Sequence, residues 1–191
     1  MSYTVDKVFN KAIVSPGEFP TGEFEKCIFN SCDFSNANLS ELVFTDCRFN
    51  ECDLSLAKLK KAAFRKVQFS SCKMLGLHFT DCNTFGLEFS FENCVLNHST
   101  FYKLSIKKSI FKNTKLEEVD FTEADLRESI FENCDFLNAK FEHTILDKTD
   151  FRTSFNYSID PEMNKIKKAK FSLSQVSGLL DKYDIDIDVT N

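Results

Sequence analysis

Large apolar residues recur every five positions along most of this chain, a spacing that neither an amphipathic helix nor a β-strand produces. Residues 131–151 read FENCDFLNAKFEHTILDKTDF, and the large residues in them are Phe131, Phe136, Phe141, Leu146 and Phe151. Helix patterning repeats near 3.6 residues and strand patterning every 2. The five-residue period runs from Phe9 to Phe79 and, after a shift of two residues, from Phe91 onward. Periodicity over this length indicates an internal structural repeat.

A smaller residue lies two positions before each large one, and 19 of the 22 phenylalanines are on the large position. All eight cysteines are in the small position: Cys27, Cys32, Cys47, Cys52, Cys72, Cys82, Cys94 and Cys134. Positions two apart on an extended chain face the same side. Each unit therefore has a small and a large residue inside, a polar residue outside between them, and two residues left to turn a corner.

Residues twenty apart match in type, which predicts four such sides per turn of a coil. One column contains Phe91, Phe111, Phe131, Phe151 and Phe171. Because stacked strands lie about 4.8 Å apart, outward charges at this spacing should be neighbours. Opposite charges meet far more often than like charges, as in Glu41/Lys61, Asp53/Lys73, Glu92/Lys112, Lys103/Glu123, Lys108/Glu128, Lys112/Glu132, Glu128/Lys148 and Glu132/Arg152; Lys107/Arg127 is a like pair.

The period is broken at two places and changes character near the C-terminus. The phase shift at about 80–90 contains Gly86 and is interpreted as a tolerated bulge or a contact with a partner. The period lapses again at about 152–165, where we expect a loop. Residues 172–191 are expected to form a short α-helix and tail, because Ser172 and Gln175 have capping-box spacing. Its apolar face would cap the last coil or join two copies, through Leu173, Val176, Leu179, Leu180 and Tyr183.

Composition and residue pattern argue against most kinds of chemistry. The net charge of −5 is not that of a typical nucleic-acid binder. No signal-peptide core or membrane-length apolar run is present, which favours a cytoplasmic protein. The cysteines share their position with alanine, serine and threonine, so we interpret them as core residues; a metal-binding ladder at Cys32, Cys52 and Cys72 is the weaker alternative. We expect no catalytic residues, no cofactor and no metal, because no phosphate loop or nucleophile elbow is found.

Several units resemble those of the pentapeptide-repeat family, which read roughly A(D/N)LXX. They are ANLSE (37–41), CDLSL (52–56), ADLRE (124–128), CDFLN (134–138) and TDFRT (149–153). The resemblance extends from about Phe9 to Phe171. It implies an all-β fold, a right-handed quadrilateral β-helix, as a single domain over residues 1–171 with a short C-terminal α-helix after it.

The resemblance also implies a binding function. Members of this family bind bacterial DNA gyrase and topoisomerase IV by mimicking duplex DNA, and the quinolone-resistance (Qnr) subgroup dimerises through its C-terminal ends. An acidic block offers a candidate partner surface at Glu117, Glu118, Asp120, Glu123, Asp125 and Glu128. Lysine clusters at 58–66 and 103–115 interrupt the acidity, and no long projecting loop is evident. We therefore favour a non-enzymatic scaffold, dimeric through its C-terminal helix, for an unidentified protein partner; the alternative is a DNA-mimicking topoisomerase modulator.

Overall fold

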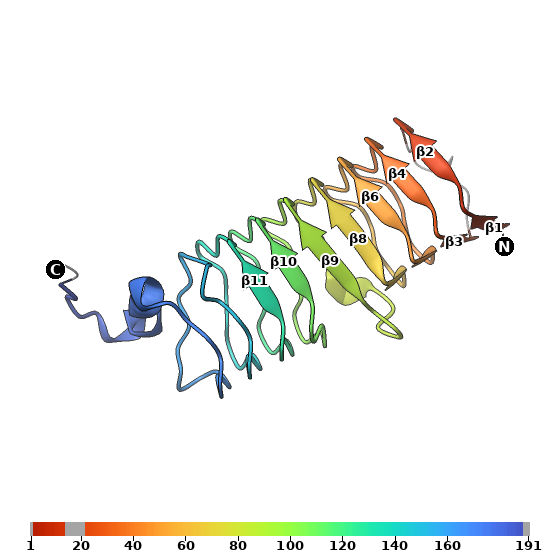
Figure 1. Ribbon diagram of the computed structural model, residues 1–191. Helices are drawn as coiled ribbons and strands as arrows, with labels where there is room; N and C mark the ends of the chain where they lie inside the picture. The colour runs from red at the N-terminus through yellow and green to blue at the C-terminus, as the bar shows by residue number, and fades with distance from the viewer. Residues whose placement is uncertain (1, 14–21, 189–191) are drawn as a thin grey trace.

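The chain forms a rod of stacked coils with its two termini at opposite ends (Figure 1). The structure, a computed structural model, describes residues 2–13 and 22–188. The predicted fold class, a right-handed quadrilateral β-helix, is confirmed. The large positions expected at Val14 and Phe19 lie outside the described residues. Within the described ranges, no helix is long and apolar enough to cross a membrane.

Two parallel sheets form two sides of the rod. The short sheet has the order β1-β3-β5-β7, with strands at Ser2–Val5, Gly22–Glu25, Val43–Thr45 and Ala63–Arg65. The long sheet has the order β11-β10-β9-β8-β6-β4-β2. Its strands, from β2 to β11, are Val8–Asn10, Ile28–Asn30, Arg48–Asn50, Val67–Ser70, Phe89–Glu92, Ile110–Lys112 and Ile130–Glu132. Register follows the predicted spacing, for example Phe29 opposite Phe49, and the other sides are joined by single bridges such as Asp33↔Asp53.

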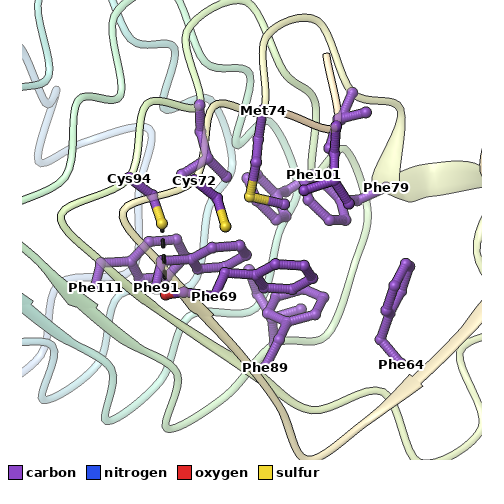
Figure 2. Close-up of a cluster of buried hydrophobic side chains, with 14 of the residues drawn as sticks. Phe64, Phe69, Cys72, Met74, Phe79, Phe89, Phe91, Cys94, Phe101 and Phe111 are labelled. Atoms are coloured by element: carbon purple, nitrogen blue, oxygen red, sulfur yellow. Dashed lines mark hydrogen bonds between the residues drawn. The ribbon is translucent and has the colours of Figure 1, made fainter. Parts of the chain in front are cut away.

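The core consists of columns of stacked aromatic rings along the rod axis. One column is Phe9, Phe29, Phe49, Phe69, Phe91, Phe111, Phe131, Phe151 and Phe171, and every ring in it is stacked on the next. Ring centroids are 4.6 Å apart between Phe29 and Phe49 and 5.4 Å apart between Phe151 and Phe171. Figure 2 shows the Phe69, Phe91 and Phe111 part of this column. Parallel coils in register place identical side chains face to face, which is why one residue type repeats.

The small inward position also has a hydrogen-bonding role that residue size alone does not predict. The thiol of Cys94 donates to the carbonyl oxygen of Phe69 in the preceding coil, at 3.4 Å (Figure 2). The hydroxyl of Thr144 makes the equivalent bond to Phe121 at 2.9 Å. All eight cysteines are buried and none is in a disulfide. Cysteine, serine and threonine recur here because each is small and brings a donor to a buried carbonyl.

The corners of the coil adopt left-handed backbone conformations, mostly without glycine. The residue two positions after most of the large ones has a positive φ, as in Leu56 (58°), Lys108 (59°) and Asn133 (52°). This conformation costs a non-glycine residue about 1–2 kcal/mol. The parallel ladder on both sides of each corner holds the backbone there. Asparagine suits the position and adds side-chain ladders, because Asn113 donates to Asn93 at 3.0 Å and Asn133 donates to Asn113 at 2.9 Å.

At the phase shift, a loop takes the place of one inward-facing position of the repeat. Phe69 pairs with Phe91, so two extra residues lie between β8 and β9. The short 3₁₀ helix η1 (Phe79–Asp81) precedes a loop that projects from the rod beside these strands (Figure 1). Loop residues Asn83, Thr84, Phe85 and Gly86 are exposed, so the loop adds no ring to the Phe24–Phe44–Phe64 column in the core.

Phe89 supplies an inward ring to the coil that contains this loop. It lies opposite Val67 in a small inward position, yet it carries a full ring that is 3% exposed. Its ring centroid is 5.1 Å from that of Phe91 and 5.4 Å from that of Phe79. In Figure 2 the ring points into the core beneath Phe69 and Phe91. A large residue in the small position therefore compensates for a missing one in the large position.

The C-terminal helix is present, but it is a 3₁₀ helix and not the predicted α-helix. It comprises η2 (Leu173–Leu179) and η3 (Asp181–Tyr183). The predicted capping box is not formed, because the Ser172 side chain makes no cap bond and contacts the Ser174 hydroxyl. Serine and glycine have weak α-helix propensity, and Gly178 uses its carbonyl oxygen to accept a hydrogen bond from Ile159 N at 2.8 Å. The contact of this segment with the last coil therefore influences its conformation.

Residues 152–165, where we expected a loop, remain joined to the stack. Phe155 bridges to Asp135, and Lys165 bridges to Ile145. Tyr157 and Ile159 are buried. The period lapses in the sequence here because Tyr157 and Ile159 fill the core from other positions of the unit.

Candidate protein-interaction surfaces

The outer surface is organised into straight columns of side chains that run along the rod. Each column contains residues about twenty apart, so its members come from successive coils. One column alternates in charge through Lys26, Asp46, Lys66, Glu88, Lys108, Glu128 and Lys148. Like charges are thereby kept from stacking, which would oppose the register of the coils.

The predicted acidic surface encircles one coil and does not form one face. Glu118, Glu123 and Glu128 are three successive corner residues, with φ of 55°, 56° and 62°. Asp120 and Asp125 lie on the sides between these corners, where they bridge to neighbouring coils. Residues adjacent in a solenoid sequence point to different sides, so an acidic run in sequence is not an acidic patch in space.

Most of these acidic side chains have a partner on a neighbouring coil. Glu117 accepts a hydrogen bond from Asn97 at 2.9 Å, and a His98 ring nitrogen is 3.2 Å from Glu118. Lys103 is 3.5 Å from Glu123, and Lys148 is 3.1 Å from Glu128. The hydrogen bond from Lys148 lowers the pKa of Glu128. The acidic coil is therefore largely neutralised by its neighbours.

The predicted charge columns are confirmed for several pairs and wrong for one set. Ion pairs form at Glu41/Lys61, Asp53/Lys73, Glu92/Lys112, Lys103/Glu123, Lys108/Glu128 and Glu128/Lys148. Glu132 was expected to pair with both Lys112 and Arg152, but within the described ranges it has no ion-pair partner. Lys112 pairs with Glu92, and Arg152 lies 2.7 Å from Asp150 on its own side of the coil. A partner two positions along the strand is about 6.6 Å away between backbones, which the long arginine side chain spans.

Two aspartates on the sides of the coils, Asp125 and Asp150, each contact two cationic side chains. Asp125 lies 2.6 Å from Arg127 and 3.3 Å from Lys107, so the predicted like pair Lys107/Arg127 shares one anion. Burial raises the pKa of Asp125, but hydrogen bonds from Arg127 and Lys107 outweigh it and the pKa is lowered overall. Asp150 lies between Arg152 at 2.7 Å and Lys170 at 3.5 Å. The Arg152 guanidinium holds the pKa of Asp150 at about 2.

We expect Asp150→Asn to lower the free energy of unfolding by about 1 kcal/mol at pH 7, because a charge-assisted hydrogen bond is lost. A carboxyl whose folded pKa is depressed stabilises the fold above its unfolded pKa of about 3.9. This contribution disappears as pH falls through the folded value of about 2. Urea unfolding of both proteins between pH 7 and pH 2 should show the difference shrinking below about pH 4.

Glu132→Gln is the matched control for this experiment, because it removes one carboxylate that has no ion-pair partner among the described residues. It should unfold like the wild type at every pH. A difference between Asp150→Asn and wild type that persists unchanged at pH 2 would contradict the assignment.

A groove opens beside the phase shift, across four successive coils. It has a volume of about 740 Å³. Arg48, Lys66, Lys107 and Lys108 lie along it, together with Asp46 and Glu88. The repeat pattern alone does not reveal this groove, because the two extra residues break the twenty-residue spacing between the residues that line it.

The projecting loop beside the groove exposes one aromatic ring. Phe85 is 78% exposed, and the guanidinium carbon of Arg65 lies 5.8 Å from its ring centroid. Backbone nitrogen of Phe85 donates to the Asn83 side chain at 3.0 Å, which shapes the loop. An exposed ring held in this way is the most prominent apolar feature on this part of the rod.

The candidate dimer residues of the C-terminal helix divide between the core and the solvent. Leu173 is 89% exposed, Val176 37% and Tyr183 52%. Leu179 packs against the core, and Leu180 is half-buried. The exposed members form the part of the predicted face that is available to a partner.

Burial keeps three of the core thiols protonated. Burial raises the pKa of Cys47, Cys82 and Cys134 to about 12, whereas a reactive cysteine needs a lowered pKa. No group of histidine, cysteine or acidic side chains in the described part of the chain could hold a metal ion.

Solved structures with the same architecture belong to proteins of different biological processes. Full-length QnrB1, a plasmid-mediated fluoroquinolone resistance protein, superposes with a TM-score of 0.62 at 17% identity, covering 96% of this chain and 100% of that chain. HetL, a pentapeptide repeat protein involved in heterocyst differentiation regulation from the cyanobacterium Nostoc sp. strain PCC 7120, gives 0.59 at 12% identity, covering 90% and 84%. No curated protein matches this sequence. Likeness at such low identity shows the fold alone.

The family is shown by the sequence itself. The model of the pentapeptide repeat region matches residues 22–90 and 87–158, on both sides of the phase shift. These ranges cover most of the chain and coincide with the columns of buried phenylalanine described above. The chain belongs to the pentapeptide-repeat family.

Proposed function

We propose that this protein is a non-enzymatic scaffold that binds a protein partner through the outer columns of its rod. The observation that carries the proposal is the regular surface: successive coils present side chains in register along straight, rigid sides. A rigid surface of this kind binds without paying much conformational entropy. The buried, protonated thiols described above fit the same role, and reduced cysteines suit a cytoplasmic setting.

The candidate partner surface is the acidic coil and its neighbours. Glu118 and Glu123 are exposed at two corners, where they contact His98 and Lys103 of the preceding coil. A cation of a binding partner can replace these residues as the contact of each carboxylate. The exposed apolar residues of the C-terminal helix, led by Leu173, supply the candidate homodimer contact. Both surfaces project from elements that the core holds in place.

DNA mimicry of the topoisomerase-binding type is the alternative function. The likeness to QnrB1 in fold favours it. A mimic needs a continuous negative surface that replaces phosphates in a basic groove. The column from Lys26 to Lys148 alternates in sign, and the acidic coil is paired with basic neighbours, so the charge distribution favours the scaffold.

A DNA gyrase supercoiling assay, with and without a fluoroquinolone, separates the two functions. We expect neither inhibition nor protection at micromolar protein, with QnrB1 as the positive control. Protection or inhibition by this protein would instead establish the mimic.

The scaffold itself is tested by affinity capture from the native host, comparing wild type with Glu118→Lys/Glu123→Lys. We expect a partner that the wild type retains and the double variant loses. Glu41→Lys is the control, because Glu41 lies in the same corner column as Glu123 but several coils away. Equal capture by all three proteins would rule out the acidic coil, and no specific capture by the wild type would rule out the scaffold.

A further inference from the structure

The N-terminal end of the rod exposes the edges of both sheets. β1 and β2 are the terminal strands of the short and long sheets. The first coil also exposes apolar side chains, with Tyr3 62%, Val8 55% and Ile13 77% exposed. An exposed edge of this kind is a template for pairing with another strand.

The hydrogen bonds of the second coil show which groups of β2 face the open end. Ile28 N donates to Lys7 O at 2.9 Å, and Asn30 O accepts from Lys11 N at 2.8 Å, both toward the N-terminal end of the rod. The equivalent groups in the first coil are the Val8 N–H and the Asn10 carbonyl. No described coil lies beyond them, so β2 presents a donor and an acceptor in strand geometry.

The opposite end of the rod carries a segment with the pattern of a strand. Residues 184–188 read DIDID, a strict alternation of acidic and β-branched residues. Such alternation is typical of a half-buried strand. In the structure the segment forms no strand, and Ile185 and Ile187 are 56% and 43% exposed.

The two ends are complementary in charge. Lys7 and Lys11 lie immediately before and after β2, are exposed, and have no ion-pair partner among the described residues. The aspartates of the 184–188 segment lie between its isoleucines. If Ile187 were placed inward over the Phe9 ring, Asp186 and Asp188 would lie over Val8 and Asn10 on the outer face, each one position from a lysine in the register.

We propose that residues 184–188 of one molecule add as a parallel strand to β2 of a second copy, with Ile187 packed on Phe9. Figure 1 places the two elements at opposite ends of the rod, so a molecule does not make this contact with itself. The addition gives the Val8 N–H and the Asn10 carbonyl their partners and buries an isoleucine on the partly buried Phe9. Because the contact is head-to-tail, copies join end to end into longer rods. This association is separate from the proposed partner binding and from a two-fold dimer of C-terminal helices.

Sedimentation velocity over a range of protein concentrations tests the contact with two disabling variants. Ile185→Lys/Ile187→Lys removes the apolar side of the added strand. Val8→Pro removes the exposed N–H at the first residue of β2, where proline is tolerated in an edge strand. The wild type should form concentration-dependent oligomers beyond a dimer, and each variant alone should associate about tenfold to a hundredfold more weakly.

Mixing the two variants provides the decisive measurement. Each keeps the half of the contact that the other has lost, so an equimolar mixture should form complexes containing both variants that neither variant forms alone. A wild type that associates no further than either variant, a Val8→Pro variant that associates like the wild type, or a mixture no larger than the separate variants would each overturn the proposal.

Circular dichroism melting confirms that each variant is folded. If Val8→Pro does not fold, Lys7→Glu/Lys11→Glu replaces it, because this variant leaves the backbone intact and opposes the acidic strand by charge. It should weaken association at low salt, and mixing it with the tail variant should again form complexes that contain both variants. Association of this variant equal to that of the wild type would count against the contact.

Discussion

Replacing Phe89 with alanine is expected to lower the free energy of unfolding by about 3–5 kcal/mol, the usual cost of removing a buried aromatic ring. Phe89 supplies the inward ring that the exposed loop 83–86 does not, and its ring is in contact distance of Phe79, Phe91 and Phe101. The surrounding coils are held by their ladders and cannot collapse into the cavity. Chemical denaturation followed by circular dichroism measures the effect.

Phe85→Ala is the matched control, because it removes the same kind of ring from the loop just before β9. Phe85 is 78% exposed, so its loss should change the stability by about 0.5 kcal/mol or less. If the two variants were equally stable, Phe89 would not be the residue that compensates for the phase shift.

Gly178→Ala is expected to release the C-terminal helix from the last coil. A Cβ at this position would lie 2.0 Å from the Tyr157 carbonyl oxygen, which is backbone and cannot move aside. The hydrogen bond from Ile159 N to Gly178 O, 2.8 Å long, would be lost with the contact. Overpacking of this kind costs about 1–3 kcal/mol, so exchange of the Ile159 amide hydrogen should accelerate about tenfold to a hundredfold.

Hydrogen exchange read by mass spectrometry or NMR measures this release, and Ser177→Ala is its control. Ser177 is the preceding residue, and its side chain is exposed. The control should leave Ile159 protected. Protection that survives in Gly178→Ala would show that the helix does not depend on this close approach.

The position of the acidic residues shows why a candidate surface is harder to predict than a fold. The five-residue period correctly placed Glu118, Glu123 and Glu128 at corners of the coil, yet their closeness in sequence suggested a patch. Each corner turns the chain to another side, so the three carboxylates face different directions. The residues that do share a surface, such as Arg48 and Lys107 in the groove, come from different coils.

The conformation of individual residues depended on the stack more than on their own preferences. Leu56 and Lys108 hold left-handed corners that favour glycine or asparagine, because ladders on both sides fix the corner. Arg152 had two acidic residues within reach and pairs with Asp150, which the side of the coil brings closer than Glu132. The C-terminal segment is 3₁₀ because Gly178 docks on Tyr157.

The sequence alone determined the architecture of this protein, because the alternation of large and small side chains is a local pattern that recurs in every coil. Large and small residues at fixed spacing leave one way to bury the phenylalanines, and the columns follow from it. Only the tertiary structure decided what happens where the period fails: how Phe89 replaces a missing ring, which groove the phase shift opens, and which edge strands stay exposed. These features depend on contacts between coils, among residues that are no longer twenty positions apart in the sequence.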